Sequence, residues 1–204
     1  AEMPGMYPEG EYDLAGFAVG VVEKSQIIDG SKVKPGDVVL GLASSGPHSN
    51  GFSLIRKIVE VSGASWDMPF DGATLADRLM EPTRIYCKQV ANVMKKVPIH
   101  AMAHITGGGL VENVPRVLPE GTQVVIHRDS WKRPAIFDWL QKEGNVAEDE
   151  MLRVFNNGIG LVVIVPAEAA DAAVSAFESE GEKVYRLGEV VNRANAADPG
   201  CVVI

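Results

Sequence analysis

The sequence has few cysteines, few positive charges and no long apolar run, and each shortage argues against a class of protein. Its two cysteines, Cys87 and Cys201, are too few and too far apart for a disulfide framework or a cysteine-based zinc site. Nineteen Lys and Arg against 27 Asp and Glu give a net charge of −8, which disfavours nucleic-acid binding through phosphate neutralisation. The longest apolar stretches, such as residues 161–165, have the length of strands and fall far short of the ~20 residues of a membrane helix.

The first residues also lack the pattern of a secretory signal. Residues 1–12 contain no basic stretch followed by an apolar core, and they open on a turn-rich segment, so we expect no signal peptide. The low cysteine content suits a reducing compartment. We therefore expect a cytoplasmic protein without a membrane partner.

The composition is that of a folded globular protein, with 46% hydrophobic and 23% charged residues. Strand and helix patterns intermix along all 204 residues without internal repeats. This order predicts an α/β (α+β) fold in which helices cover a mixed sheet. We expect strands at residues 14–22, 37–43, 99–105, 122–127, 159–165, 183–187, 189–190 and 201–204. We expect helices at residues 52–60, 82–96, 110–114, 135–143, from 148, and 166–180, and an irregular loop at 66–73.

A polar loop at residues 44–51 follows the buried strand expected at 37–43. Because a helix is expected to begin at Phe52, backbone N–H groups and the helix dipole there favour an anion. Gly46 and Gly51 have the Walker A spacing, but Phe52 stands where that motif needs Lys, which excludes a P-loop. The alternative is a connecting loop in which Ser49 or Asn50 caps the helix. The candidate binding residues are Ser44, Ser45, Gly46, His48, Ser49, Asn50 and Gly51.

Two further glycine-bearing turns lie beside expected strands. The first holds His104, Thr106, Gly107, Gly108 and Gly109, and its glycines let a ligand approach the backbone closely. It lacks the spacing of a dinucleotide-binding loop, and a tight turn is the alternative interpretation. The second, at residues 155–160, includes Asn156; here a helix stop before a strand is the simpler interpretation.

The remaining titratable residues form no recognisable motif. His100 and His104 are four apart, but alternating apolar residues predict a strand there, and no Glu follows His100, so a metalloprotease motif is absent. We interpret His100 and His127 as structural histidines with satisfied hydrogen bonds. Residues 148–150 are interpreted as a solvated helix start, and we assign no metal ligands.

Several motifs occurring together in order make the sequence specific. Residues 1–7 (AEMPGMY), 14–17 (LAGF), 19–24 (VGVVEK) and 27–30 (IIDG) come first, and 44–51 (SSGPHSNG) with 52–54 (FSL) follow. Residues 82–86 (PTRIY), 104–109 (HITGGG) with 112–119 (ENVPRVLP), and 155–160 (FNNGIG) complete the series. Over nearly the whole chain this series resembles the phosphoribosylformylglycinamidine cyclo-ligases, also called aminoimidazole ribonucleotide synthetases, of purine biosynthesis.

The resemblance implies a reaction that needs more chain than is present here. Family members close the imidazole ring of formylglycinamidine ribonucleotide. ATP phosphorylates the formyl amide oxygen, and the amidine-side nitrogen then attacks the activated carbon. Their N-terminal domain holds ATP and Mg²⁺ through acidic residues and forms the homodimer, and nothing here matches it. The resemblance thus implies that residues 1–204 are a single C-terminal domain, with residues 1–12 as a junction segment, and that the chain alone is a monomer without activity.

On this resemblance the chain supplies the substrate-side wall of the active-site cleft. We expect Ser44, Ser45, Gly46, Ser49, Asn50, Gly51, His104, Thr106, Gly107, Gly108, Gly109 and Asn156 to bind the substrate or its phosphate. His48 is the catalytic candidate, as a hydrogen-bond donor to the phosphate or to the reacting amide.

Two groups of alternatives stay open. One is a related domain of the same superfamily: half of a formylglycinamidine ribonucleotide amidotransferase, or an enzyme making selenophosphate or thiamine pyrophosphate. The other is a noncatalytic ligand-binding or interaction module.

Overall fold

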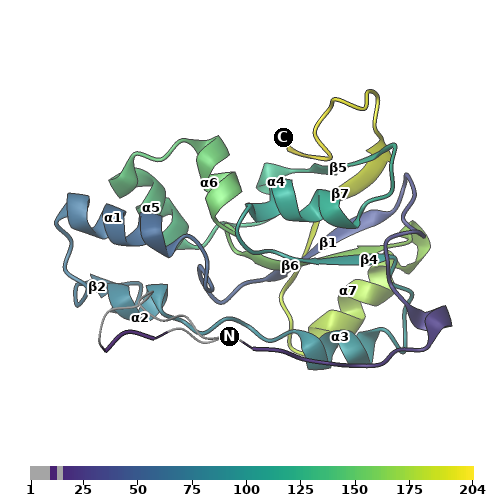
Figure 1. Cartoon of the computed structure of the whole chain (residues 1–204), viewed down its shortest axis with the longest axis horizontal. Helices are drawn as coiled ribbons and strands as arrows, with labels where there is room; N and C mark the ends of the chain where they lie inside the picture. Colours follow the sequence, from purple (N-terminus) through teal and green to yellow (C-terminus); the bar gives the residue numbers. More distant parts are fainter. Residues whose placement is uncertain (1–9, 13–15) are drawn as a thin grey trace.

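A six-stranded mixed sheet forms the centre of the molecule (Figure 1). The computed structural model describes residues 10–12 and 16–204. The strands lie in the order β4 (Ala101–His104), β6 (Ile159–Val165), β1 (Val38–Ala43), β7 (Val184–Asn192), β5 (Thr122–Ile126) and β8 (Cys201–Val203). All neighbours are antiparallel except β5 and β8, which are parallel. The predicted fold class, a mixed sheet covered by helices, is confirmed.

Helices cover both faces of this sheet. On one face lie α3 (Cys87–Val93) and α7 (Ala170–Ser179), and on the other lie α4 (Gly109–Asn113) and the 3₁₀ helix η2 (Val114–Val117). Strand β6 is buried along its whole length. Its side chains alternate between the two cores, with Val162 and Ile164 in one and Leu161 and Val163 in the other. The run at 159–165 is therefore apolar throughout because both of its faces are covered.

A group of helices beyond one end of the sheet forms a third core, on the left in Figure 1. It contains α1 (Phe52–Ser62), α2 (Leu75–Leu79), α5 (Ala135–Gly144) and α6 (Glu148–Val154), with the short hairpin β2 (Pro69–Phe70) and β3 (Ala73–Thr74). The hairpin corrects the expectation of an irregular loop at residues 66–73, and α2 follows it as a helix that the sequence pattern did not predict. Short 3₁₀ helices complete the elements: η1 (Lys24–Gln26), η3 (Arg128–Ser130) and η4 (Ala167–Ala169).

The strand expected at residues 14–22 is wrong over its described part. Leu14 lies outside the described residues, as do residues 1–9 of the expected junction segment. Residues 16–22 form no strand, and Phe17 and Val21 are 94% and 102% exposed. The alternating pattern is present, but within the described chain no neighbouring strand pairs with it, and a strand needs such a partner.

Two other boundaries also differ from expectation. Helix α3 begins at Cys87 instead of Pro82, because the carbonyl of Pro82 and the side chain of Tyr86 bind the loop after β1. The two short strands expected at 183–187 and 189–190 are one strand, β7, with an irregularity in its pairing to β1 between Val39 and Leu40. Both thiols are free, with Cys87 exposed and Cys201 buried. In the described residues, no helix is long and apolar enough to cross a bilayer.

A close contact between His100 and the buried Asp37 fixes the start of β1 to the segment before β4. His100 Nδ1 lies 2.7 Å from Asp37 Oδ2, and the Asp37 side chain is 1% exposed. The same carboxylate oxygen accepts a hydrogen bond from the backbone N–H of Lys34 at 3.1 Å. This geometry confirms the interpretation of His100 as a structural histidine.

Replacing Asp37 by Ala should lower the free energy of unfolding by about 3–5 kcal/mol, because His100 and a backbone N–H lose a buried partner. Urea unfolding monitored by circular dichroism measures this. Glu60→Ala is the matched control, since it breaks an ion pair between side chains that are 61% and 70% exposed and should change stability little. Equal losses in the two variants would contradict the prediction.

Candidate functional site

The three glycine-bearing turns of the sequence meet at one end of three neighbouring strands, β4, β6 and β1. Strands β1 and β4 are both antiparallel to β6, which lies between them. The carboxyl ends of β1 and β4 therefore flank the amino end of β6. As a result, the loop at 44–51, the loop at 104–109 and the turn at 155–160 are neighbours, although more than a hundred residues separate the first from the last.

Asn156 connects two of these turns. Its Nδ2 donates to the carbonyl of Gly46 at 2.9 Å, and its Oδ1 accepts from Ser44 Oγ at 3.1 Å and from the backbone N–H of Gly158 at 2.8 Å. The side chain is fully buried. Asn156 therefore positions the loop, and the direct ligand contact expected from the sequence stays a prediction.

His48 is held in one tautomer by the backbone. It is 3% exposed and lies at a positive φ of 59°. Its Nε2 accepts from the backbone N–H groups of Ser45 at 3.2 Å and Arg84 at 3.5 Å, so the proton of the neutral ring is on Nδ1. Within the described chain, this buried Nδ1 has no hydrogen-bond partner. Burial, with the charges of His104 and Arg84, lowers the pKa of His48 to about 4. The ring is thus a neutral donor near pH 7 and has no free lone pair to act as a base.

The ring of His48 lies close to two other rings, those of Tyr86 and His104, which come from different segments. The ring of His48 lies 6.5 Å from that of Tyr86 and 6.4 Å from that of His104, which in turn lies 6.5 Å from Tyr86. Burial raises the pKa of Tyr86, and its hydroxyl donates to the carbonyl of Ala43 at 2.8 Å. A Cβ at Gly160 would lie 2.0 Å from that hydroxyl and 2.7 Å from the His48 ring. Only glycine at the start of β6 leaves room for both rings.

The donors around the loop at 44–51 differ from those expected. Ser44 Oγ donates to Asn156 and Ser45 Oγ donates to the carbonyl of Pro82, so neither hydroxyl has a proton left for an anion. Ser49 Oγ lies 3.2 Å from Thr83 Oγ1. Helix α1 begins after Gly51 without a side-chain cap, which rules out the alternative of a cap by Ser49 or Asn50. Its first backbone N–H groups therefore have no side-chain cap, and they carry the positive end of the helix dipole.

The loop at 104–109 is folded around one amide. Asn113 Nδ2 donates to the carbonyls of Thr106, Gly107 and Gly109, the last at 2.8 Å, and Thr106 Oγ1 donates to Asn113 Oδ1. Gly109, at a φ of 57°, lies so close to α6 that a Cβ would be 1.9 Å from the carbonyl oxygen of Leu152. Gly109 is thus required for packing. His104 and Gly107 are exposed, and Gly108 precedes α4 at a φ of 99°.

Sequence reasoning missed the residues that lie between the two loops. Thr83, Arg84 and Tyr86 lie in an irregular segment that contacts His48 and Ser49, and Arg84 pairs with Glu182 before β7. The signal was available, because residues 82–86 belong to the series of motifs. It was obscured by the interpretation of Pro82 as a helix start.

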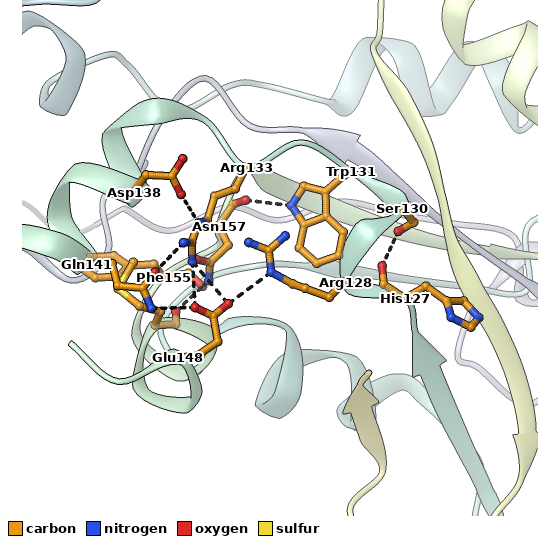
Figure 2. A network of polar contacts seen from close by, with 11 residues as sticks. His127, Arg128, Ser130, Trp131, Arg133, Asp138, Gln141, Glu148, Phe155 and Asn157 are labelled. Atoms are coloured by element: carbon orange, nitrogen blue, oxygen red, sulfur yellow. Dashed lines mark hydrogen bonds and ion pairs between the residues drawn. The ribbon is translucent and has the colours of Figure 1, made fainter. Parts of the chain in front are cut away.

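A second polar network contacts the turn at 155–158 through the backbone carbonyl of Asn157 (Figure 2). Trp131 Nε1 donates to the carbonyl of Asn157 at 2.9 Å, and Arg128 lies over the Trp131 ring. Glu148 accepts from Arg128, Arg133 and Gln141. Burial acts to raise the pKa of Glu148, but these donors outweigh it and lower the pKa.

One sequence interpretation is confirmed in this region and another changes. Glu148 is exposed in the first turn of α6, as expected of a solvated helix start, and it also belongs to an ion-pair network. His127 is exposed at the end of β5, and its contact to Ser130 Oγ runs through its backbone carbonyl, so its ring has no structural role of the kind expected.

Comparison with known proteins gives a family and full-length relatives. Residues 34–197 match the family model described as the C-terminal domain of AIR synthase related proteins. The chain is 58% identical over 203 residues to the phosphoribosylformylglycinamidine cyclo-ligase of Cupriavidus pinatubonensis, covering 100% of this chain and 58% of that protein. The cyclo-ligase of Nitrosospira multiformis is 58% identical over 190 residues, covering 93% and 54%. The chain therefore spans little more than half the length of these curated relatives.

Solved structures share the fold at low identity. A thiamine-monophosphate kinase from Stenotrophomonas maltophilia matches with a TM-score of 0.62 and 16% identity over 89% of this chain and 54% of that one. The hydrogenase maturation protein HypE, in complex with ATP, matches with a TM-score of 0.58 and 23% identity over 85% and 49%. These likenesses show the fold alone.

The tautomer and pKa of His48 can be measured in this chain. In an NMR titration, the His48 ring should stay neutral and protonated on Nδ1 from pH 8 to pH 5, with a midpoint near 4. Because the unfolded ring binds protons near its usual pKa of about 6.5, the contribution of His48 makes stability fall as pH decreases from about 6.5 to 4. His48→Gln should lose that part of the dependence. A titration midpoint near 6.5 or a proton on Nε2 would contradict the assignment.

Proposed function

We propose, from the premise that the chain belongs to the AIR synthase related C-terminal domain family, that it is the substrate-side domain of a phosphoribosylformylglycinamidine cyclo-ligase. The observation that carries the proposal is the convergence of the three glycine-bearing turns around His48 in a chain 58% identical to such enzymes. The whole protein would catalyse ATP-dependent closure of formylglycinamidine ribonucleotide to aminoimidazole ribonucleotide, as a ligase of purine biosynthesis in the cytoplasm.

We assign ATP and Mg²⁺ to the part of the protein beyond this chain, as the resemblance implies. ATP supplies the phosphoryl group that makes the formyl oxygen a good leaving group. The described residues bring together no three carboxylate, His or Cys side chains in a geometry suited to a metal, and no step is routed through one here. We also assign the homodimer interface to that other part, so that this chain alone is a monomer.

The residues of this chain bind and orient the substrate. The uncapped N–H groups at the start of α1, with Ser49, Asn50 and Gly51 beside them, offer donors to a phosphate group. The Nδ1–H of His48 is a buried donor without a partner in the described chain, and it can bind the phosphate or the reacting amide. Ser44, Ser45, Gly46 and Asn156 hold this loop in place. His104, Thr106, Gly107 and Gly108 form the facing wall.

Two competing functions have distinct experimental signatures. A superfamily relative making selenophosphate or a thiamine phosphate would share the fold, as the thiamine-monophosphate kinase of Stenotrophomonas maltophilia does. Such a relative would not turn over formylglycinamidine ribonucleotide. A noncatalytic module would bind the ribonucleotide without turnover even when joined to the rest of the protein.

In the full-length protein, His48→Ala should reduce turnover of formylglycinamidine ribonucleotide at least ~10-fold, equivalent to about 1.4 kcal/mol, because a preorganised donor is lost. His48→Gln, whose carboxamide can replace the Nε2 acceptor, should keep the fold and still turn over slowly. His127→Ala is the matched control at an exposed histidine. Wild-type rates in both His48 variants would reduce His48 to a loop residue.

The isolated chain should neither hydrolyse ATP nor form aminoimidazole ribonucleotide, because the groups assigned to ATP lie outside it. A phosphate-release assay and detection of the product amine measure this. Product formation by the purified chain, at a rate proportional to its concentration and absent from a mock purification, would refute the division of labour between the two parts.

A further inference from the structure

The largest opening beside the candidate site is a cavity of about 520 Å³. It lies between the segment before α3, helix α3 itself and the ends of β4 and β6. Its lining includes the polar side chains of Thr83, Arg84 and His104 and apolar side chains such as those of Val90 and Met102. Such a cavity suits a ligand that has one anionic group on a less polar body.

The guanidinium of Arg84 is fixed on two of its three nitrogens. Its Nε lies 3.0 Å from Glu182 Oε2, and its Nη2 donates to the carbonyl of Gly181 at 3.1 Å. The Arg84 side chain is 34% exposed, while that of Glu182 is 0% exposed. Arg84 is therefore anchored from behind, and its remaining edge is available to the cavity that it lines.

The burial of the Glu182 carboxylate lowers the stability of the folded protein. Neither of its carboxylate oxygens makes a hydrogen bond within the described chain, so its pairing with Arg84 is its main compensation. Burying a charge with so little hydrogen bonding costs stability. If this side chain only filled space, an apolar side chain would serve equally well without the cost of burying a charge. The role left for the carboxylate is to orient the guanidinium of Arg84.

The two loops of the candidate site lack a cation of their own. Residues 44–51 and 104–109 contain no Lys or Arg, and the whole chain carries a charge of −8. A dianionic phosphate bound by neutral donors alone would gain less than one that also contacts a guanidinium. Arg84 stands beside these loops, because its backbone N–H contacts His48 and the neighbouring Thr83 contacts Ser49.

We infer that Arg84 binds the phosphate group of a phosphorylated ribose compound in this cavity, and that the buried carboxylate of Glu182 is the positioning residue that orients it. The inference rests on the proposed function, since it names a cation beside the phosphate donors of that site: Thr83 lines both this cavity and the neighbouring one that is bounded by His48 and Ser49. The sugar then lies against the apolar wall formed by residues such as Val90 and Met102.

Ribose 5-phosphate titrated into the purified chain, followed by NMR, tests the inference. Wild type should bind it saturably, with shifts at residues 83–86 and 104. Arg84→Met should weaken binding at least about tenfold, since hydrogen bonds to charged groups are of that order, and Arg84→Lys should restore only part of the affinity because it lacks the fork. Arg153→Met, which removes another exposed arginine paired with a Glu, should bind as wild type does.

Glu182→Gln separates positioning from simple charge. If Glu182 orients Arg84, this variant binds ribose 5-phosphate more weakly although it is one unit less negative. If Glu182 only neutralises Arg84, the variant binds more tightly, which overturns the positioning role. Unchanged affinity in Arg84→Met, or no saturable binding by wild type at 10 mM, overturns the role of Arg84.

Turnover of formylglycinamidine ribonucleotide by the wild-type full-length protein is scored separately. Its absence would refute the proposed function while leaving the binding result intact. In the full-length protein, Arg84→Met should raise KM for the ribonucleotide more than it lowers kcat.

Discussion

The carboxamide of Asn156 is the interaction on which the arrangement of the site depends. It joins the loop that leaves β1 to the turn that enters β6, two neighbouring strands at the centre of the sheet. Because both turns are irregular backbone, their polar groups need partners that the sheet does not provide. One buried amide with a donor and an acceptor on the same plane supplies them. The position of His48 follows, since the loop that carries it is closed by this contact.

Two of the buried polar groups that lack complete partners lie beside Arg84. The Nδ1 of His48 and the carboxylate of Glu182 are both buried and make no hydrogen bond within the described chain. Further unpartnered atoms of the described chain lie elsewhere, on Asp37, Gln89, Asn157 and Arg193, whereas Asn113 donates to three backbone carbonyls. Unsatisfied groups cost stability, and natural proteins retain them chiefly where a ligand or a mechanism uses them.

Much of the fold was readable because local patterns and tertiary surroundings agree. The continuous apolar run at 159–165 forms a strand buried on both faces, and the helix expected after Gly51 begins at Phe52. The local pattern and the structure disagree where the conformation depends on contacts, or on missing contacts, with residues far away in the sequence. Residues 16–22 alternate like a strand but pair with nothing in the described chain. Residues 82–86 follow helix rules after a proline, yet they lie outside α3, and Pro82 and Thr83 contact the loop at 44–51 instead.

The sequence by itself determined the class of fold, the family resemblance and the loops that carry the site, because these depend on periodicity and on short runs of specific residues. It also marked His48 as the central side chain. Only the tertiary structure decided what each residue can do. Strand order brings the three turns together. Two backbone N–H groups fix the tautomer of His48, and burial lowers its pKa. Asn156 connects two of the loops through hydrogen bonds. Arg84 and Glu182 meet across almost a hundred residues. Such roles depend on which groups share a desolvated volume, and that is set by packing, which no local pattern in a single sequence records.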